Sequence, residues 1–274
     1  MAEVANNYGG NGAGTSTLYL KINSNGKLFH KAGDTDKTIF LQRQAENPGY
    51  DGSDIGVAEI VSSQSGAKYY HKQYNCTEYG KISGIDISNA KFDTGEVPML
   101  RIFIKAAEGN QECISLPVYN TKGTGLNQIV KGIITILPNI DLSVEYSVST
   151  SKKEYVKDNG QKTYSISAFF NYMNGTERDF VKSAILYKSD KNPDGVIPSP
   201  AVVKKFGKEV WDFSEQDEYL NTVLEQQLER IAKELKASTA PSPKSNEKQS
   251  KPVAPKNVET VKGKELPIDD EMPF

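Results

Sequence analysis

The 274-residue sequence predicts a mainly β body, followed by one long helix and a tail. Three observations lead to this fold class. Short runs rich in Ile, Val, Tyr, Phe and Thr recur up to residue 172, an apolar stripe with helical spacing follows residue 214, and the chain after residue 237 is rich in Pro, Lys and Ser. We therefore expect a flexible N-terminus (1–16), a body (17–213), a helix (214–237), a disordered linker (238–264) and an acidic end segment (265–274).

The strands of the body are predicted from short runs in which apolar and polar residues partly alternate. These runs are 17–22, 37–42, 56–61, 68–76, 81–87, 99–105, 112–119, 142–148 and 164–172. Turn signals such as Asn25-Gly26 and Asp158-Asn159-Gly160 separate several of them, and the second predicts a β-hairpin. In the last run, the alternate residues are expected to face the core: Tyr164, Ile166, Ala168, Phe170 and Tyr172.

Two segments are predicted to be helical. Residues 126–137 lie between the Gly-rich stretch 122–125, which we interpret as a loop, and Pro138. In residues 214–236, Ser214 is expected to cap the helix, with Asp217 three residues later in a position close to a capping box. The apolar stripe of this helix must be buried, either on its own body or against a second subunit. The stripe consists of Leu220, Leu224, Leu228, Ile231 and Leu235.

An antiparallel body with a helix between its late strands is compatible with the oligonucleotide-binding (OB) fold, a Greek-key barrel of five strands. The body is nearly twice as long as such a barrel requires. Extra strands or long hairpins are therefore expected to decorate the barrel.

Composition excludes several other classes. Two cysteines, Cys76 and Cys113, form no CxxC pair, and together with His30 and His71 they predict no metal site. No catalytic motif is present, so we expect neither enzymatic activity nor a cofactor. The sequence shows no signal peptide and no apolar run that could span a bilayer, so we expect a cytoplasmic protein. Residues 1–213 have only one more basic than acidic side chain, so any nucleic-acid site must be a local patch.

Strand alternation predicts faces that combine rings and cations. In residues 100–105, Leu100, Ile102 and Ile104 are expected in the core, with the other residues on the opposite face; in residues 18–22, Leu18, Leu20 and Ile22 are expected to point inward. The residues predicted to face outward are Arg101, Phe103, Lys105, Tyr19 and Lys21, with Lys68, Tyr70, Lys72 and Tyr74 on one face of the fourth run. Unpaired bases stack on aromatic rings and phosphates attract cations, so these residues are candidates for binding single-stranded nucleic acid. The alternative is that tyrosines pack within sheets and lysines protect sheet edges.

A second group of candidates precedes the Asn159-Gly160 turn. Lys152, Lys153 and Tyr155 could lie on a mobile hairpin arm that closes over a bound strand, or on an ordinary solvated hairpin.

The chain ends in three carboxylates followed by an apolar residue, a proline and a terminal phenylalanine: Asp269, Asp270, Glu271, Met272, Pro273 and Phe274. A terminal Phe presents both a ring and a carboxylate to a basic-rimmed apolar pocket. This segment resembles the acidic C-terminal tip of the single-stranded DNA-binding proteins of bacteria and their phages. With its size and the long helix before its tail, the chain is more similar to a divergent phage-encoded member of this family than to the short bacterial form. Glu271 and Met272 replace an aspartate and an aliphatic residue, and both changes keep the chemical character.

The resemblance implies that the body coats single-stranded DNA during replication, recombination and repair, and that the tip recruits other proteins of these processes. It implies no membrane partner. Homo-oligomerisation through residues 214–237 is the alternative to packing on the body. A recombination mediator or annealing protein, or a β-rich structural virion protein, remains possible from the residues alone.

Overall fold

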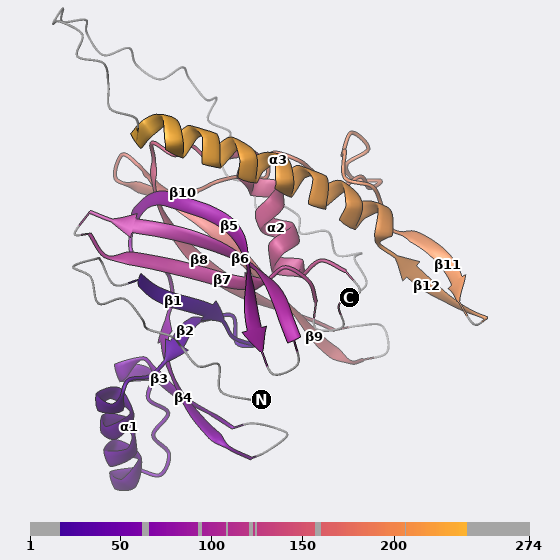
Figure 1. The fold of residues 1–274 in the computed structure, drawn as a ribbon. Helices are drawn as coiled ribbons and strands as arrows, with labels where there is room; N and C mark the ends of the chain where they lie inside the picture. Colours follow the sequence, from indigo (N-terminus) through magenta and orange to yellow (C-terminus); the bar gives the residue numbers. More distant parts are fainter. Residues whose placement is uncertain are drawn as a thin grey trace, which may run out of the picture. The chain divides into compact units, whose positions relative to one another are not determined.

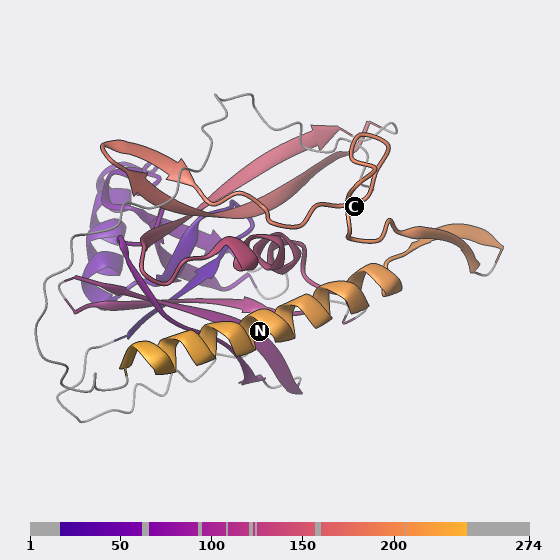
Figure 2. The ribbon, with the colours of Figure 1, turned by 90° about the horizontal axis from the view of Figure 1, so that it is seen from above.

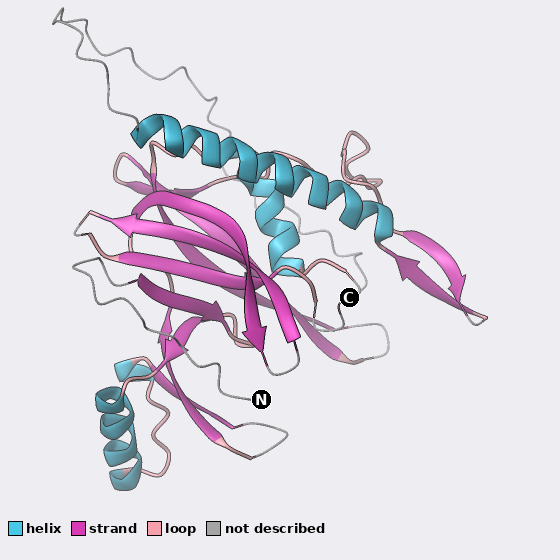
Figure 3. Cartoon of the chain, viewed as in Figure 1, coloured by secondary structure: helices cyan, strands magenta, loops and turns pink. Residues whose placement is uncertain are grey.

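The computed structural model describes residues 17–61, 66–92, 95–107, 109–120, 123, 125–156, 160–205 and 207–239. It confirms a mainly β body (Figures 1 and 3). The strands are β1 (Thr17–Ile22), β2 (Leu28–Lys31), β3 (Val57–Val61), β4 (Lys68–Tyr74), β5 (Gly80–Phe92), β6 (Gly95–Ala106), β7 (Gln111–Pro117), β8 (Glu145–Val156), β9 (Lys162–Asn174), β10 (Glu177–Phe180), β11 (Ala201–Lys205) and β12 (Lys208–Asp212). The helices are α1 (Asp34–Glu46), α2 (Gln128–Ile136) and α3 (Ser214–Thr239), with short 3-10 turns at Ser53–Ile55 (η1) and Leu137–Asn139 (η2).

One ten-stranded mixed sheet has the order β10-β9-β8-β5-β6-β7-β1-β2-β4-β3, and β11 and β12 form a separate two-stranded sheet. Within the described ranges, β1 and β7 are the parallel pair and the other neighbours are antiparallel. The two end strands, β10 and β3, do not pair with each other in this part of the chain. No closed barrel is therefore found.

The main core lies on one face of this sheet, around α2. Figure 2 shows α2 between β8 and β9 on one side and β5, β6 and β7 on the other. The helix forms here because Asn127 caps it, accepting a hydrogen bond from the backbone N–H of Ile129 at 2.9 Å, and because it is apolar on most of its surface. The predicted core residues Leu100, Ile102 and Ile104 are at most 1% exposed and pack with it.

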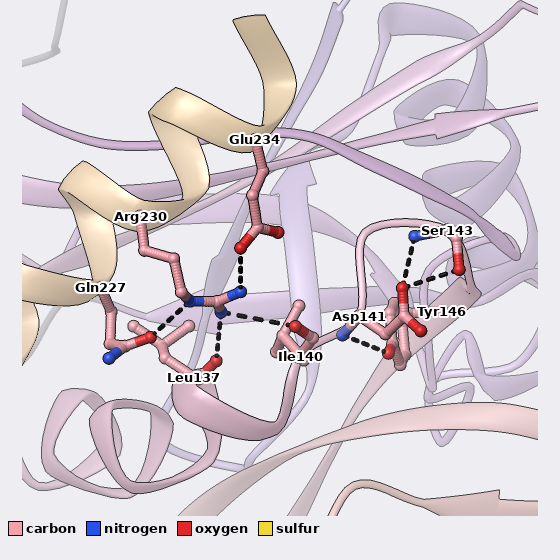
Figure 4. A network of polar contacts seen from close by, with 8 residues as sticks. All are labelled: Leu137, Ile140, Asp141, Ser143, Tyr146, Gln227, Arg230 and Glu234. Atoms are coloured by element: carbon pink, nitrogen blue, oxygen red, sulfur yellow. Dashed lines mark hydrogen bonds and ion pairs between the residues drawn. The ribbon is translucent and has the colours of Figure 1, made fainter. Parts of the chain in front are cut away.

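The predicted helix before the tail is confirmed as α3, which continues to Thr239. Its stripe packs on the chain's own core: Leu220, Leu224 and Ile231 are buried, and Leu228 and Leu235 are partly buried against the same cluster. Polar contacts also hold α3 to η2 (Figure 4). Arg230 Nη2 donates to the carbonyl oxygens of Leu137 at 2.9 Å and Ile140 at 3.4 Å, which satisfies backbone acceptors at the end of α2.

The expected capping role of Asp217 is wrong. Its carboxylate reaches the loop before α2, where Oδ2 accepts a hydrogen bond from the backbone N–H of Leu126 at 3.0 Å. Oδ1 lies 2.6 Å from Nζ of Lys131, whose side chain is 7% exposed. Lys131 also donates to Gln216 Oε1 at 2.9 Å and lies over the ring of Phe213 at 4.8 Å. A buried polar network therefore connects α2 with the start of α3.

The strand predicted at residues 37–42 is also wrong, because this segment belongs to α1. Only Phe40 of α1 is buried, and it packs with Tyr50, Val57 and Tyr70 in a second, small apolar cluster. Acidic residues in its first turn and Arg43 in its last turn suit the helix dipole. Four short strands, β2, β10, β11 and β12, were not among the predicted runs.

Candidate nucleic-acid interface

The candidate site is the face of the large sheet opposite the main core, at strands β6, β7, β1, β2 and β4. Residues opposite each other in a sheet share a face. Phe103 on β6 and Tyr19 on β1 are both register partners of Cys113 on β7, so the three residues form one row across these strands. Lys21 is opposite Phe29, which is opposite Gln73 on β4, so the same face continues to β2 and β4. We call this surface the open face; its rings and cations include Tyr19, Lys21, Phe29, His71, Arg101, Phe103 and Lys105.

The row at the centre of the open face has two rings beside a small, buried residue. Tyr19 is 44% exposed, whereas Cys113 is fully buried. Burial raises the pKa of the Cys113 thiol to about 12, so the thiol stays protonated near neutral pH. With neighbouring strands about 4.8 Å apart, Phe103 and Tyr19 lie two strands, or roughly 10 Å, apart. Their rings can therefore receive different bases of one strand.

Gly84 gives Phe103 its place on this face. A side chain at Gly84 would bring a Cβ atom to 3.4 Å from the ring of Phe103, so the ring lies over the glycine. Arg101 lies next to it, with its guanidinium 5.4 Å from the centre of the Phe103 ring. A ring with a cation above its face has the composition that single-stranded nucleic acid binds.

The cations of the open face differ in how freely they can bind a phosphate. Arg101 donates from Nε and Nη2 to the two carboxylate oxygens of Asp86 at 2.7 and 2.8 Å, and this pairing raises its pKa. Lys21 and Lys105 are exposed, and within the described part of the chain neither has a hydrogen-bond or ion-pair partner. These two lysines are therefore the cations available to an incoming phosphate, whereas Arg101 must exchange its partner.

At the other end of the open face, Phe29 and His71 stack with their ring centres 4.2 Å apart. Burial lowers the pKa of His71, and the nearby charges of Lys21 and His30 lower it further, so the imidazole is neutral near pH 7. Sequence reasoning missed Phe29 because β2 is only four residues long, and it missed His71 because the opposite face of the predicted strand 68–76 was taken as the outward one. The Asn25-Gly26 turn followed by the alternating Leu28-Phe29-His30-Lys31 was the signal that could have identified β2.

The predicted outward orientation of one face of β4 is wrong. Lys68, Tyr70, Lys72 and Tyr74 do share one face, but the register of Leu28 with Tyr74 places that face on the core side of the sheet. There it packs under α1 and η1. Lys72 is paired with Asp36 at 3.2 Å and donates to the carbonyl oxygen of Ile55 at 2.8 Å.

The other three residues of this set have partners as well. Lys68 is paired with Glu59 at 3.1 Å, and the Tyr70 hydroxyl donates to the same carboxylate at 3.0 Å. The Tyr74 hydroxyl is hydrogen-bonded to His30 Nε2 at 2.9 Å. The structure therefore separates these four residues from the open face.

The hairpin predicted around Asn159-Gly160 is confirmed as β8 and β9, although residues 157–159 lie outside the described ranges. Its candidate residues alternate between the two faces. Lys152 lies over the ring of Tyr164 at 4.3 Å, and Lys153 lies over the ring of Tyr155 at 5.3 Å. Tyr164 is 46% exposed, so its predicted core position is wrong; it lies on the core side of β9 but beyond the end of the core.

The acidic tip, the N-terminus and nearly all of the linker lie outside the described residues. None of the helices in the described ranges has both the length and the apolar composition needed to cross a bilayer. No protein-family model matches the chain, and comparisons with curated proteins and with solved structures also found no match. Any function must therefore be argued from the chain's own residues.

Proposed function

We propose that this chain binds single-stranded DNA on the open face, without sequence preference, and recruits partner proteins through its C-terminal tip. The observation that carries the DNA-binding part is the row formed by Tyr19 and Phe103 on a face that also carries Lys21, Arg101 and Lys105. Rings stack on any base, and each such contact contributes about 1 to 3 kcal/mol. Cations add an attraction to phosphates that depends on salt.

The strand order supports the proposed relationship to the OB fold. Strands β5, β6 and β7 follow one another as antiparallel neighbours, and β8 returns after α2 to lie beside β5. The resulting order β8-β5-β6-β7 is that of a Greek key. Hydrogen bonds between Thr77 and Val148 also connect the segment after β4 to β8, at 2.9 and 2.8 Å. In this proposal, β1 to β4 and α1 are additions to an OB-type unit.

The recruiting part rests on the terminal sequence alone. Residues 269–271 supply negative charge, and Phe274 supplies a ring and a carboxylate that fit a basic-rimmed pocket on another protein. The same acids can compete with phosphates for basic residues of the body. Bound DNA would then release the tip for partners.

The DNA-binding part is tested by fluorescence anisotropy of labelled oligo(dT) and of a duplex of equal length, at two salt concentrations. We expect preference for the single strand, with affinity that falls as salt rises. Tyr19→Ala and Phe103→Ala should each weaken binding by about 5- to 100-fold, because each removes one stacking contact. Tyr119→Ala is the matched control, since Tyr119 is also exposed, at 41%, and lies outside the open face.

Equal losses for all three variants, or no binding to either DNA, would overturn the proposal. The tip is tested separately by removing residues 269–274. The shortened chain should bind oligo(dT) as well as or better than the full chain, and it should no longer capture replication proteins from a bacterial lysate. Capture of the same proteins by both chains would contradict the docking role.

A further inference from the structure

The hairpin β11–β12 is separate from the large sheet and lies directly before α3. In Figures 1 and 2 it projects beyond the first turn of α3, away from the strands of the large sheet. Its base is anchored. The backbone N–H and the hydroxyl of Ser214 donate to Asp212 Oδ1 at 3.0 and 2.6 Å, and the ring of Phe213 packs beneath Lys131. The hairpin is thus a projecting element on a fixed base.

One face of this hairpin exposes apolar surface. Val202 and Trp211 are register partners, and they are 53% and 47% exposed. A two-stranded hairpin is marginally stable by itself, so its large side chains are usually covered. Trp211 is the only tryptophan of the chain. Within the described residues, its indole N–H has no hydrogen-bond partner.

The same face also carries a cation. Lys204 lies diagonally across the strands from Trp211 and directly opposite Glu209 on the same face, but within the described part of the chain its ammonium forms no hydrogen bond or ion pair with that carboxylate. Residues 204–209 read Lys-Lys-Phe-Gly-Lys-Glu, so this end of the hairpin has three basic residues and one acidic residue. An indole with a neighbouring cation at a positively charged end complements a base and its phosphate. An apolar protein surface would leave these charges unmatched.

We propose that β11–β12 is a second nucleic-acid contact, in which Trp211 stacks on a base of single-stranded DNA and Lys204 binds the adjacent phosphate. This inference rests on the proposed function. It adds a contact outside the open face, on a separate element of the fold. The hairpin would lengthen the stretch of strand that one protein molecule holds.

The single tryptophan makes the test direct. Full-length protein is titrated with unlabelled oligo(dT), and indole emission is recorded with excitation at the red edge, where tyrosines do not absorb. A parallel titration follows the anisotropy of labelled oligo(dT). We expect indole quenching that saturates together with the anisotropy, and protection of the bound indole from acrylamide. Trp211→Ala should weaken binding about tenfold, and Trp211→Phe should restore most of it.

Met173→Ala is the matched control, because Met173 is 49% exposed on β9 and should not affect affinity. Saturating anisotropy with unchanged indole emission would overturn the hairpin contact while leaving the open face intact. Emission that changes with protein concentration in the absence of DNA would identify the hairpin as a contact between copies of the chain, and would also overturn it. Absence of any anisotropy change would reject the proposed function and the hairpin contact together.

Discussion

Asp86 restrains the most central cation of the open face, so its removal should strengthen DNA binding. The Asp86 carboxylate accepts two hydrogen bonds from Arg101, whose side chain is 29% exposed. A phosphate that binds Arg101 must approach this carboxylate. Asp86→Asn removes the negative charge and keeps the size of the side chain. We therefore expect tighter binding of single-stranded DNA rather than weaker binding.

The size of the effect follows from Coulomb's law. Two unit charges about 6 Å apart repel by about 0.7 kcal/mol in a medium with the dielectric constant of water, and by about twice that at half this constant. Asp86→Asn should therefore tighten binding about three- to tenfold at low salt. An Arg101 free to contact a phosphate should also make the salt dependence steeper, by about 0.7 in the slope of log affinity against log salt.

The assay is oligo(dT) anisotropy across a range of salt concentrations. Asp34→Asn is the control, since this exposed residue at the start of α1 changes the net charge equally but lies away from the open face. Losing a half-exposed ion pair should cost at most about 1 kcal/mol of stability, which thermal unfolding can verify. The same affinity gain in both variants, or a loss in Asp86→Asn alone, would refute the reasoning.

Three further predictions concern the body. Lys131→Met should destabilise the fold by about 3 kcal/mol, because it leaves the carboxylate of Asp217 buried without its cation. Chemical denaturation measures this loss of stability, and a loss below about 1 kcal/mol would contradict the prediction. Glu112 is buried, and burial raises its pKa although the Glu78 N–H donates to it at 2.8 Å, so the folded state binds a proton more readily than the unfolded chain. Glu112→Gln should therefore be more stable than wild type at neutral pH, and this difference in unfolding free energy should shrink as the pH falls through the raised pKa. A difference that grows on acidification would contradict the prediction. Leu224→Ala should cost about 2 to 5 kcal/mol in unfolding experiments, because Leu224 is 1% exposed in the core under α3, whereas an effect below about 1 kcal/mol would indicate that α3 is only loosely attached.

Local patterns in the sequence predicted much of the body. Alternation placed Leu100, Ile102 and Ile104 in the core and Arg101, Phe103 and Lys105 opposite them, because successive side chains of a strand point to opposite faces whatever surrounds the strand. The spacing of the leucines after Ser214 predicted α3 in the same way. The terminal Pro273-Phe274 after three acids is likewise a property of the sequence alone.

The tertiary structure decided what covers each face. Alternation correctly put four residues of β4 on one face, yet α1 and η1 pack on that face: Lys68, Tyr70, Lys72 and Tyr74. The segment containing α1 resembled a strand in sequence because Phe40 and Leu41 fit both the helical and the strand period. Asp217 stands at a capping position in sequence, but Lys131, far away in the chain, provides a stronger partner. Short patterns determine which residues lie together on an element. Contacts between distant segments determine whether those residues meet solvent, a helix or a buried charge, and no local pattern contains that information.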